Sequence, residues 1–168
     1  MKKILTILCV ICIIVPMIVY GVAIFKTIRM NVNCINYFEM AADANNVEIA
    51  EKHLTTGINY LETNNITQGS TGIIFHKPTN NIGFWYENLK SAQEQLIEMN
   101  QREDLTELEE SNALMKLRET LLDSEGRVTH PSMISFVPGH ISWFWWMIFI
   151  WLLWILAIPF GVIASEQY

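Results

Sequence analysis

The sequence predicts an all-α membrane protein in which two transmembrane helices flank an extracytoplasmic antiparallel helical bundle. Two long segments carry no charged residue, and the segment between them repeats apolar residues at helical spacing. The 168-residue chain is 51% hydrophobic and only 17% charged. Ordinary soluble domains carry about 25% charge, and disordered chains are poorer in apolar residues. Composition therefore argues against both of those classes.

The two charge-free segments have the length of membrane helices. Residues 4–25 form a run of 22 and residues 141–164 a run of 24. At about 1.5 Å of rise per residue, both exceed a hydrocarbon core about 30 Å thick. We therefore expect an N-terminal segment at 1–3, transmembrane helices at 4–25 and 141–164, a loop domain at 26–140 and a tail at 165–168.

The first apolar segment also resembles a secretory signal. Lys2 and Lys3 precede it, and the Gly-Val-Ala sequence at 21–23 offers a cleavage site. The uncharged run of 17 residues at 4–20 exceeds the about 7–15 residues of the apolar region in a cleaved signal. We favour an uncleaved signal anchor, with cleavage as the alternative. The positive-inside count is close to a tie, and the signal-like start favours cytoplasmic termini with the loop outside.

The loop domain is acidic. Residues 26–140 contain nine basic and sixteen acidic residues, which gives a net charge of −7. Such a surface repels phosphate backbones and excludes a nucleic-acid partner. For the same reason it is not expected to bind anionic lipid.

Apolar spacing predicts about four helical segments within the loop domain. Residues 30–43 are expected to continue the first membrane helix outward. Asn45, three residues before Glu48, resembles the start of a capping box. The helix after it, ending near 64–65, is marked by one apolar stripe: Val47, Ala50, Leu54, Ile58 and Leu61.

Residues 66–83 show no helical period and carry Gly and Pro, so we expect an irregular segment there. The next helix has the stripe Trp85, Leu89, Ala92, Leu96 and Met99. The last helix is expected to begin at Thr106, with a capping box to Glu109, and to stop near Gly126. It shows two candidate stripes, Leu105, Leu108, Asn112 and Met115 in one and Leu114, Leu117 and Leu121 in the other.

No pattern of residues indicates catalysis, a metal or a cofactor. The four histidines lie in the loop domain without the spacing of a zinc site. Cys9 and Cys12 lie within the first apolar segment, where thiols act as small packing residues. Cys34 either stays free or links two copies. The acidic cluster at 103–110 lacks the pattern of a calcium loop and suits the start of a helix. We therefore expect a protein that is not an enzyme.

Two groups of residues are candidate contact sites. Trp151 and Trp154 flank the midpoint of the second apolar segment, where an indole N–H finds no water. With the small residues Ala157 and Gly161, they predict a packing face. That face meets either the other helix of the same chain or another membrane protein, including a second copy. Phe75, Trp85 and Tyr86, around the irregular segment, form a possible interaction edge.

Three strings in the loop domain support a resemblance: "AADANNVEIAEKHLTTGINYLE", "GFWYENLKSAQEQL" and "SNALMKLRETLLD". Over residues 35–125 the chain resembles a family of uncharacterised bacterial or phage two-span membrane proteins with AADANN, GFWY-N-LK and SN-LMKLRE-LLD segments. The resemblance implies a bacterial inner membrane, or a host membrane for a phage protein. It implies no activity.

Two functions follow as expectations. In the first, the chain is an interaction or accessory subunit whose bundle and Trp-rich helix meet the bilayer and other membrane proteins. In the second, the bundle binds a small ligand and acts through a separate membrane partner. In that case the irregular segment, Trp85 and Tyr86 form the binding edge.

Overall fold

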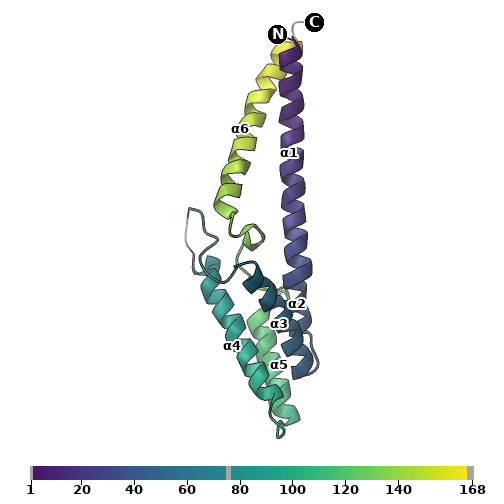
Figure 1. Cartoon of the computed structure of the whole chain (residues 1–168), viewed down its shortest axis with the longest axis vertical. Helices are drawn as coiled ribbons and strands as arrows, with labels where there is room; N and C mark the ends of the chain where they lie inside the picture. Colours follow the sequence, from purple (N-terminus) through teal and green to yellow (C-terminus); the bar gives the residue numbers. More distant parts are fainter. Residues whose placement is uncertain (1, 75–76, 166–168) are drawn as a thin grey trace.

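The computed structural model describes the backbone of residues 2–74 and 77–165 and the side chains of residues 10–74 and 77–155. Apart from two isolated β-bridges, the described regular structure is helical. Two long helices, α1 (Lys2–Met30) and α6 (His140–Ser165), run from the two chain ends toward a bundle (Figure 1). The bundle consists of α2 (Asn36–Ala42), α3 (Val47–Thr63), α4 (Ile82–Asn100) and α5 (Glu107–Leu121). The all-α class is confirmed.

The first helix enters the bundle without a break. Between α1 and α2 lies a π-helical turn, η1 (Asn31–Ile35), so residues 2–42 form one helical rod. Met30, Cys34, Phe38 and Ala42 are buried, and each lies four positions after the one before it. That repeat is longer than the 3.6 residues of an α-helix. The wider π turn keeps these four side chains on the face that meets the bundle.

Helix α3 lies at the centre of the bundle, in contact with η1, α2, α4 and α5. Its predicted apolar stripe is confirmed, because all five stripe residues are buried: Val47, Ala50, Leu54, Ile58 and Leu61. Gly57 lies against Phe38 so closely that an added Cβ would overlap the Phe38 ring. The absence of a side chain at Gly57 therefore sets how near the rod approaches α3.

The start of α3 corrects one prediction. Its N-cap is Asn46 rather than Asn45, and the Asn46 side chain accepts a hydrogen bond of 2.8 Å from the N–H of Ile49. The N–H of Val47 donates to Oε1 of Glu110 on α5, at 3.0 Å. A side chain distant in the sequence thus satisfies a donor at this helix end, which local spacing does not reveal.

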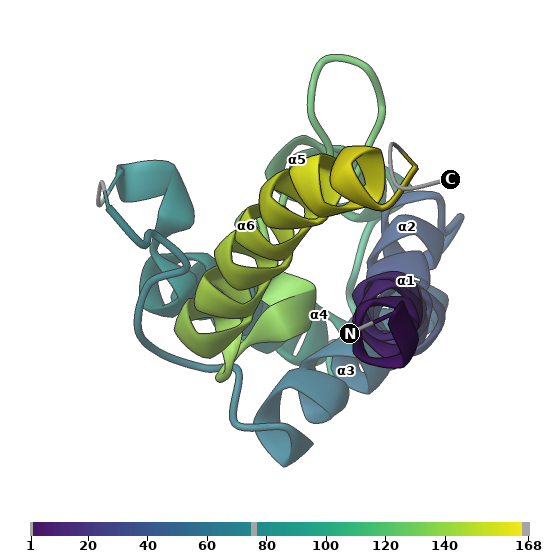
Figure 2. The ribbon, with the colours of Figure 1, turned by 90° about the horizontal axis from the view of Figure 1, so that it is seen from above.

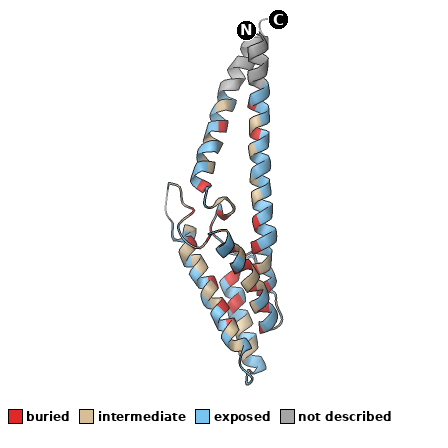
Figure 3. Ribbon diagram, viewed as in Figure 1, coloured by how far each residue is buried: buried red, intermediate tan, exposed pale blue. Residues whose placement is uncertain are grey.

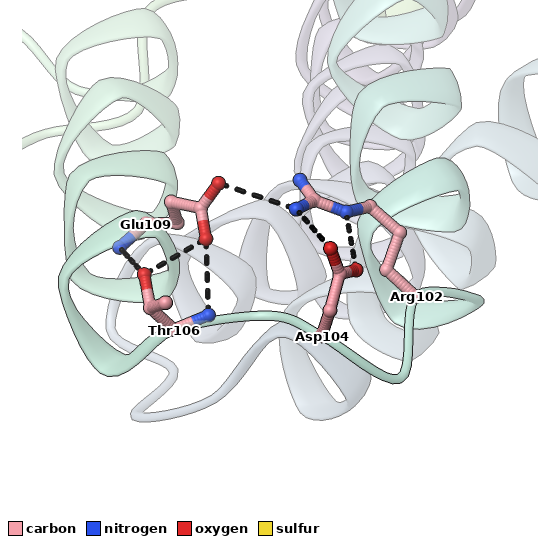
Figure 4. Close-up of polar contacts among 4 residues, drawn as sticks. All are labelled: Arg102, Asp104, Thr106 and Glu109. Atoms are coloured by element: carbon pink, nitrogen blue, oxygen red, sulfur yellow. Dashed lines mark hydrogen bonds and ion pairs between the residues drawn. The ribbon is translucent and has the colours of Figure 1, made fainter.

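Helix α5 confirms one prediction and corrects two. Thr106 is the N-cap, and Thr106 and Glu109 form the predicted capping box (Figure 4). Leu117 and Leu121 of the second stripe are buried, whereas Leu108 is 70% exposed, so the first stripe was wrong. The helix ends at Leu121 instead of near Gly126.

Gly126 serves a turn that follows α5. Its φ of 76° is in the left-handed region that glycine tolerates. Its N–H donates to the carbonyl oxygen of Asp123 at 3.0 Å. This turn joins Leu122 to Val128 through an isolated β-bridge and sends the chain toward η3 (Ile134–Phe136) and α6.

One described helix, Val10–Ala42, is long and apolar enough to cross a membrane, and 11% of its most apolar window is buried. The described side chains of α6 cover His140–Ile155, an apolar helix shorter than a full span. The second span therefore remains a prediction. Seen from above, α1 is viewed nearly end-on, and α6 slants across the bundle (Figure 2). Figure 3 shows the buried residues gathered mainly in the bundle.

Candidate functional site

Trp85 is fixed in place near the start of α4. Its indole N–H donates a hydrogen bond of 2.8 Å to the carbonyl oxygen of Thr129, which is 44 residues further along the chain. Its ring meets Phe38 edge-on, with 5.8 Å between the ring centroids. Trp85 therefore joins α4 to both the rod and the segment that leads to α6.

Tyr86 faces a different neighbour. Its hydroxyl donates a hydrogen bond of 2.6 Å to Oε1 of Glu62 on α3. Partial burial, together with the hydrogen bond to Glu62 and its negative charge, raises the pKa of Tyr86 to about 12. Trp85 and Tyr86 are adjacent in sequence but contact different parts of the bundle. Phe75, the third residue of the predicted edge, lies outside the described residues.

A polar network continues from Tyr86 along the α3–α4 interface. Lys90 Nζ lies 3.6 Å from Oε1 of Glu62 and donates to Oε1 of Gln93 at 2.8 Å. The buried Gln93 donates to the hydroxyl of Thr55, also at 2.8 Å. Each polar group has a partner within the network, so these contacts fix the register of α4 on α3.

A groove of about 290 Å³ opens beside Trp85. Its apolar lining includes Trp85, Leu89 and Phe84, and Phe84 is 61% exposed. Thr129, His130 and Pro131 also line the groove, because the chain returns to α4 after α5. Sequence reasoning missed Phe84 and His130, because only the return of the chain after α5 places them together. A groove lined by apolar side chains with a few polar groups is the usual form of a small-molecule binding site.

Trp151 and Trp154 lie in a second groove, between α1 and α6. With Tyr20 and Ile150 they line a volume of about 220 Å³. Ile150 is buried, whereas the two tryptophans are more than half exposed. The side chains of Ala157 and Gly161, the other members of the predicted packing face, lie outside the described residues.

Cys34 is fully buried in the bundle core. Its Sγ donates to the carbonyl oxygen of Gly57 at 3.6 Å. A disulfide between two copies would need this thiol at the surface, so its position argues against the predicted alternative of a linked dimer. Among the described residues, no group of three or more His, Cys, Asp or Glu could hold a metal ion.

The acidic cluster before α5 is organised by one arginine. Arg102 lies 3.1 Å from Asp104 and 3.3 Å from Glu109 (Figure 4). Its hydrogen bond and charge hold the pKa of Asp104 below its usual range. The pKa of Glu109 is lowered first by the backbone N–H of Thr106, then by the Thr106 hydroxyl and Arg102. The geometry is that of a capped helix start.

No family model matches this chain, and no curated protein or solved structure is significantly similar to it. The resemblance to two-span membrane proteins drawn from three sequence strings therefore stays a prediction.

Proposed function

We propose that the chain is an integral membrane protein with two spans that presents its acidic bundle on the extracytoplasmic face as an interaction subunit. The observation that supports the proposal most is where the apolar side chains are exposed. On α1 and the described part of α6 they face outward, whereas in the bundle most of them face a core (Figure 3).

The exposed apolar side chains on the two long helices include large residues at successive turns. They are Ile13, Met17, Ile18, Ile24 and Phe25 on α1, and Trp145, Phe149, Trp151, Leu152 and Ile155 on α6. Soluble monomers rarely expose apolar patches larger than a few hundred Å². Lipid covers such a surface without cost, and it also suits the aromatic residues near the start of α6, where an aromatic belt is expected.

Membrane integration is tested by extraction. Membranes from cells that express the full chain are washed with alkaline carbonate and then with mild detergent. We expect the protein to stay in the pellet after carbonate and to be released by detergent. Release by carbonate alone would place the protein at the membrane surface and overturn the proposal.

The groove beside Trp85 is the proposed partner-binding surface. Phe84 is exposed at its rim, although it lies in the first turn of α4 beside otherwise packed residues. A photoreactive amino acid at Phe84 is expected to crosslink to another membrane protein in cells. The matched control is Met115, an exposed apolar residue on α5, where no crosslink is expected. Equal crosslinking at both positions would contradict this assignment.

Ligand sensing is the second candidate, because the same groove is apolar and has polar groups at His130 and Asn88. Its volume of about 290 Å³ is at the lower limit of small-molecule pockets, which begin near 300 Å³. The two candidates separate in one experiment. A small molecule that raises the melting temperature of the detergent-solubilised chain, with loss of the effect in His130→Ala, supports sensing.

A further inference from the structure

The face of α1 that turns inward is apolar except at one position. Its buried and half-buried residues include a series spaced by four or three, as in a helix packing seam: Cys12, Pro16, Val19, Ala23, Lys26 and Met30. Lys26 is the only charged residue in this series. It lies one turn before the buried Met30, where the apolar part of the rod gives way to the bundle.

The Lys26 ammonium group lies against an aromatic ring of α6 that stacks on a ring of η3. Its Nζ lies 5.5 Å from the centroid of the Trp143 ring on α6. Trp143 in turn stacks on Phe136 of η3, with 5.2 Å between the ring centroids. A cation–π contact leaves the ammonium N–H groups able to donate hydrogen bonds. Among the described side chains, neither Lys26 nor Arg29 forms an ion pair with an acidic residue.

A second polar group lies on the same face of α6. His140 is three residues before Trp143, so the two side chains share a helix face. His140 is 9% exposed, and its Nδ1 is buried without a hydrogen-bond partner in the described structure. Because that nitrogen is enclosed, a ligand from outside the chain would meet Lys26 rather than His140.

An apolar groove continues from this point along the two helices. The groove between Tyr20, Trp151 and Trp154 begins six residues from Lys26, which is about 9 Å along the helix axis. Its volume is about 220 Å³. One turn of a helix occupies roughly 400 Å³, so the groove encloses no helix turn, and an alkyl chain fits in it over part of its length.

We propose that α1 and α6 hold one anionic phospholipid, with its headgroup phosphate at Lys26 and one acyl chain between Tyr20, Trp151 and Trp154. Charge favours this position, because Lys26 and Arg29 lie at the membrane end of a domain whose net charge is −7. Elsewhere the acidic surface repels an anionic headgroup. The inference rests on the proposed membrane integration.

The test is the thermal unfolding of the full chain in detergent with added lipid. Phosphatidylglycerol is compared with phosphatidylcholine of the same acyl chains, and inorganic phosphate is a third arm. We expect phosphatidylglycerol to raise the melting temperature more than phosphatidylcholine, and phosphate alone to have no effect. Equal effects of the two lipids would overturn the proposal, and a full effect of phosphate would replace the lipid with a free anion.

Variants locate the site. Lys26→Gln is expected to remove the difference between the two lipids, whereas Lys52→Gln, a matched change of an exposed lysine on α3, keeps it. Trp151→Ala is expected to reduce stabilisation by both lipids. Lys26→Arg retains the charge and is expected to keep the lipid preference. That result would show that the effect of Lys26→Gln comes from the lost charge and not from misfolding. A preference that survives in Lys26→Gln would contradict the assignment. A chain that needs detergent but shows no lipid preference would refute this site and leave the proposed function standing.

Discussion

At the scale of single residues, close approach and hydrogen bonding hold the helices of the bundle in register. Gly57 admits the Phe38 ring against α3, and Trp85 and Tyr86 tie α4 to separate neighbours. The sequence marked Trp85 and Tyr86 as important because large aromatic residues flank an irregular segment. Their partners, Thr129 and Glu62, are distant in sequence, and only the folded chain identifies them.

Gly57→Ala is expected to destabilise the bundle. The new methyl group would overlap the fully buried Phe38 ring, and overpacking a core costs about 1–3 kcal/mol. Alanine gains about 1 kcal/mol of helix propensity over glycine, which offsets only part of that cost. The melting temperature of the full chain in detergent is therefore expected to fall. Gly21→Ala is the control, because no atom lies within 4 Å of a Cβ at that position, and its melting temperature is expected not to fall.

The raised pKa of Tyr86 predicts that the folded chain loses stability at alkaline pH. The phenol has a pKa near 10 in the unfolded chain and about 12 in the folded one. Below pH 10 both states keep the proton, so the contribution is complete. Between about pH 10 and 12 only the unfolded state releases it, and stability falls as pH rises.

Unfolding of the full chain across this range measures the effect. Tyr86→Phe is expected to lose about 1.5 kcal/mol at neutral pH, because a hydrogen bond to a charged group contributes about 1.5–3 kcal/mol and this one is partly exposed to water. It is also expected to weaken the alkaline decline. An identical decline in both proteins would show that Tyr86 does not hold its proton in the folded state.

At the scale of helices, apolar spacing predicted α3 and α4 well and α5 poorly. The stripe of α3 is unambiguous because its polar residues leave only one apolar face. In α5 two stripes compete, and Leu108 and Met115 are exposed although they have suitable spacing. Contact with α2 and α4 decides between them. Spacing within one helix carries no information about that choice.

The capping box of α5 gives a prediction at the same scale. Thr106→Ala removes the side chain that accepts from the N–H of Glu109, at 3.3 Å, and is expected to cost about 1 kcal/mol. Chemical unfolding monitored by circular dichroism measures the loss. Ser111→Ala, at an exposed position within the same helix, is the control. Equal stability of the two variants would contradict a capping role.

Glu109 adds a pH dependence in acid. Its pKa is lowered by the N–H and hydroxyl of Thr106 and by Arg102, so its contribution is present above the ordinary pKa of a glutamate. It is lost as pH falls through the lowered pKa. Glu109→Gln is expected to reduce the loss of stability between neutral and acidic pH. An unchanged acid dependence would show that other carboxylates determine it.

At the scale of the whole molecule, the chain divides into a bundle with a core and two long apolar helices whose described side chains are mostly exposed (Figure 1, Figure 3). Composition and charge-free length predicted this division, because both are properties of long segments. The grooves were beyond sequence reasoning. One depends on the return of residues 129–131 to α4, and the other on the slant of α6 against α1.

The central claim is that the bundle lies on the outer face of a membrane and both chain ends lie inside. It is tested by labelling intact cells with a membrane-impermeant thiol reagent. Ser124→Cys places a thiol in the exposed turn after α5, and the fully buried Cys34 serves as an internal control that stays unlabelled in the folded chain.

We predict that Ser124→Cys is labelled in intact cells, whereas Lys3→Cys and Glu166→Cys are labelled only after the membrane is permeabilised. Labelling of the terminal positions in intact cells, with protection of position 124 until lysis, would contradict the account.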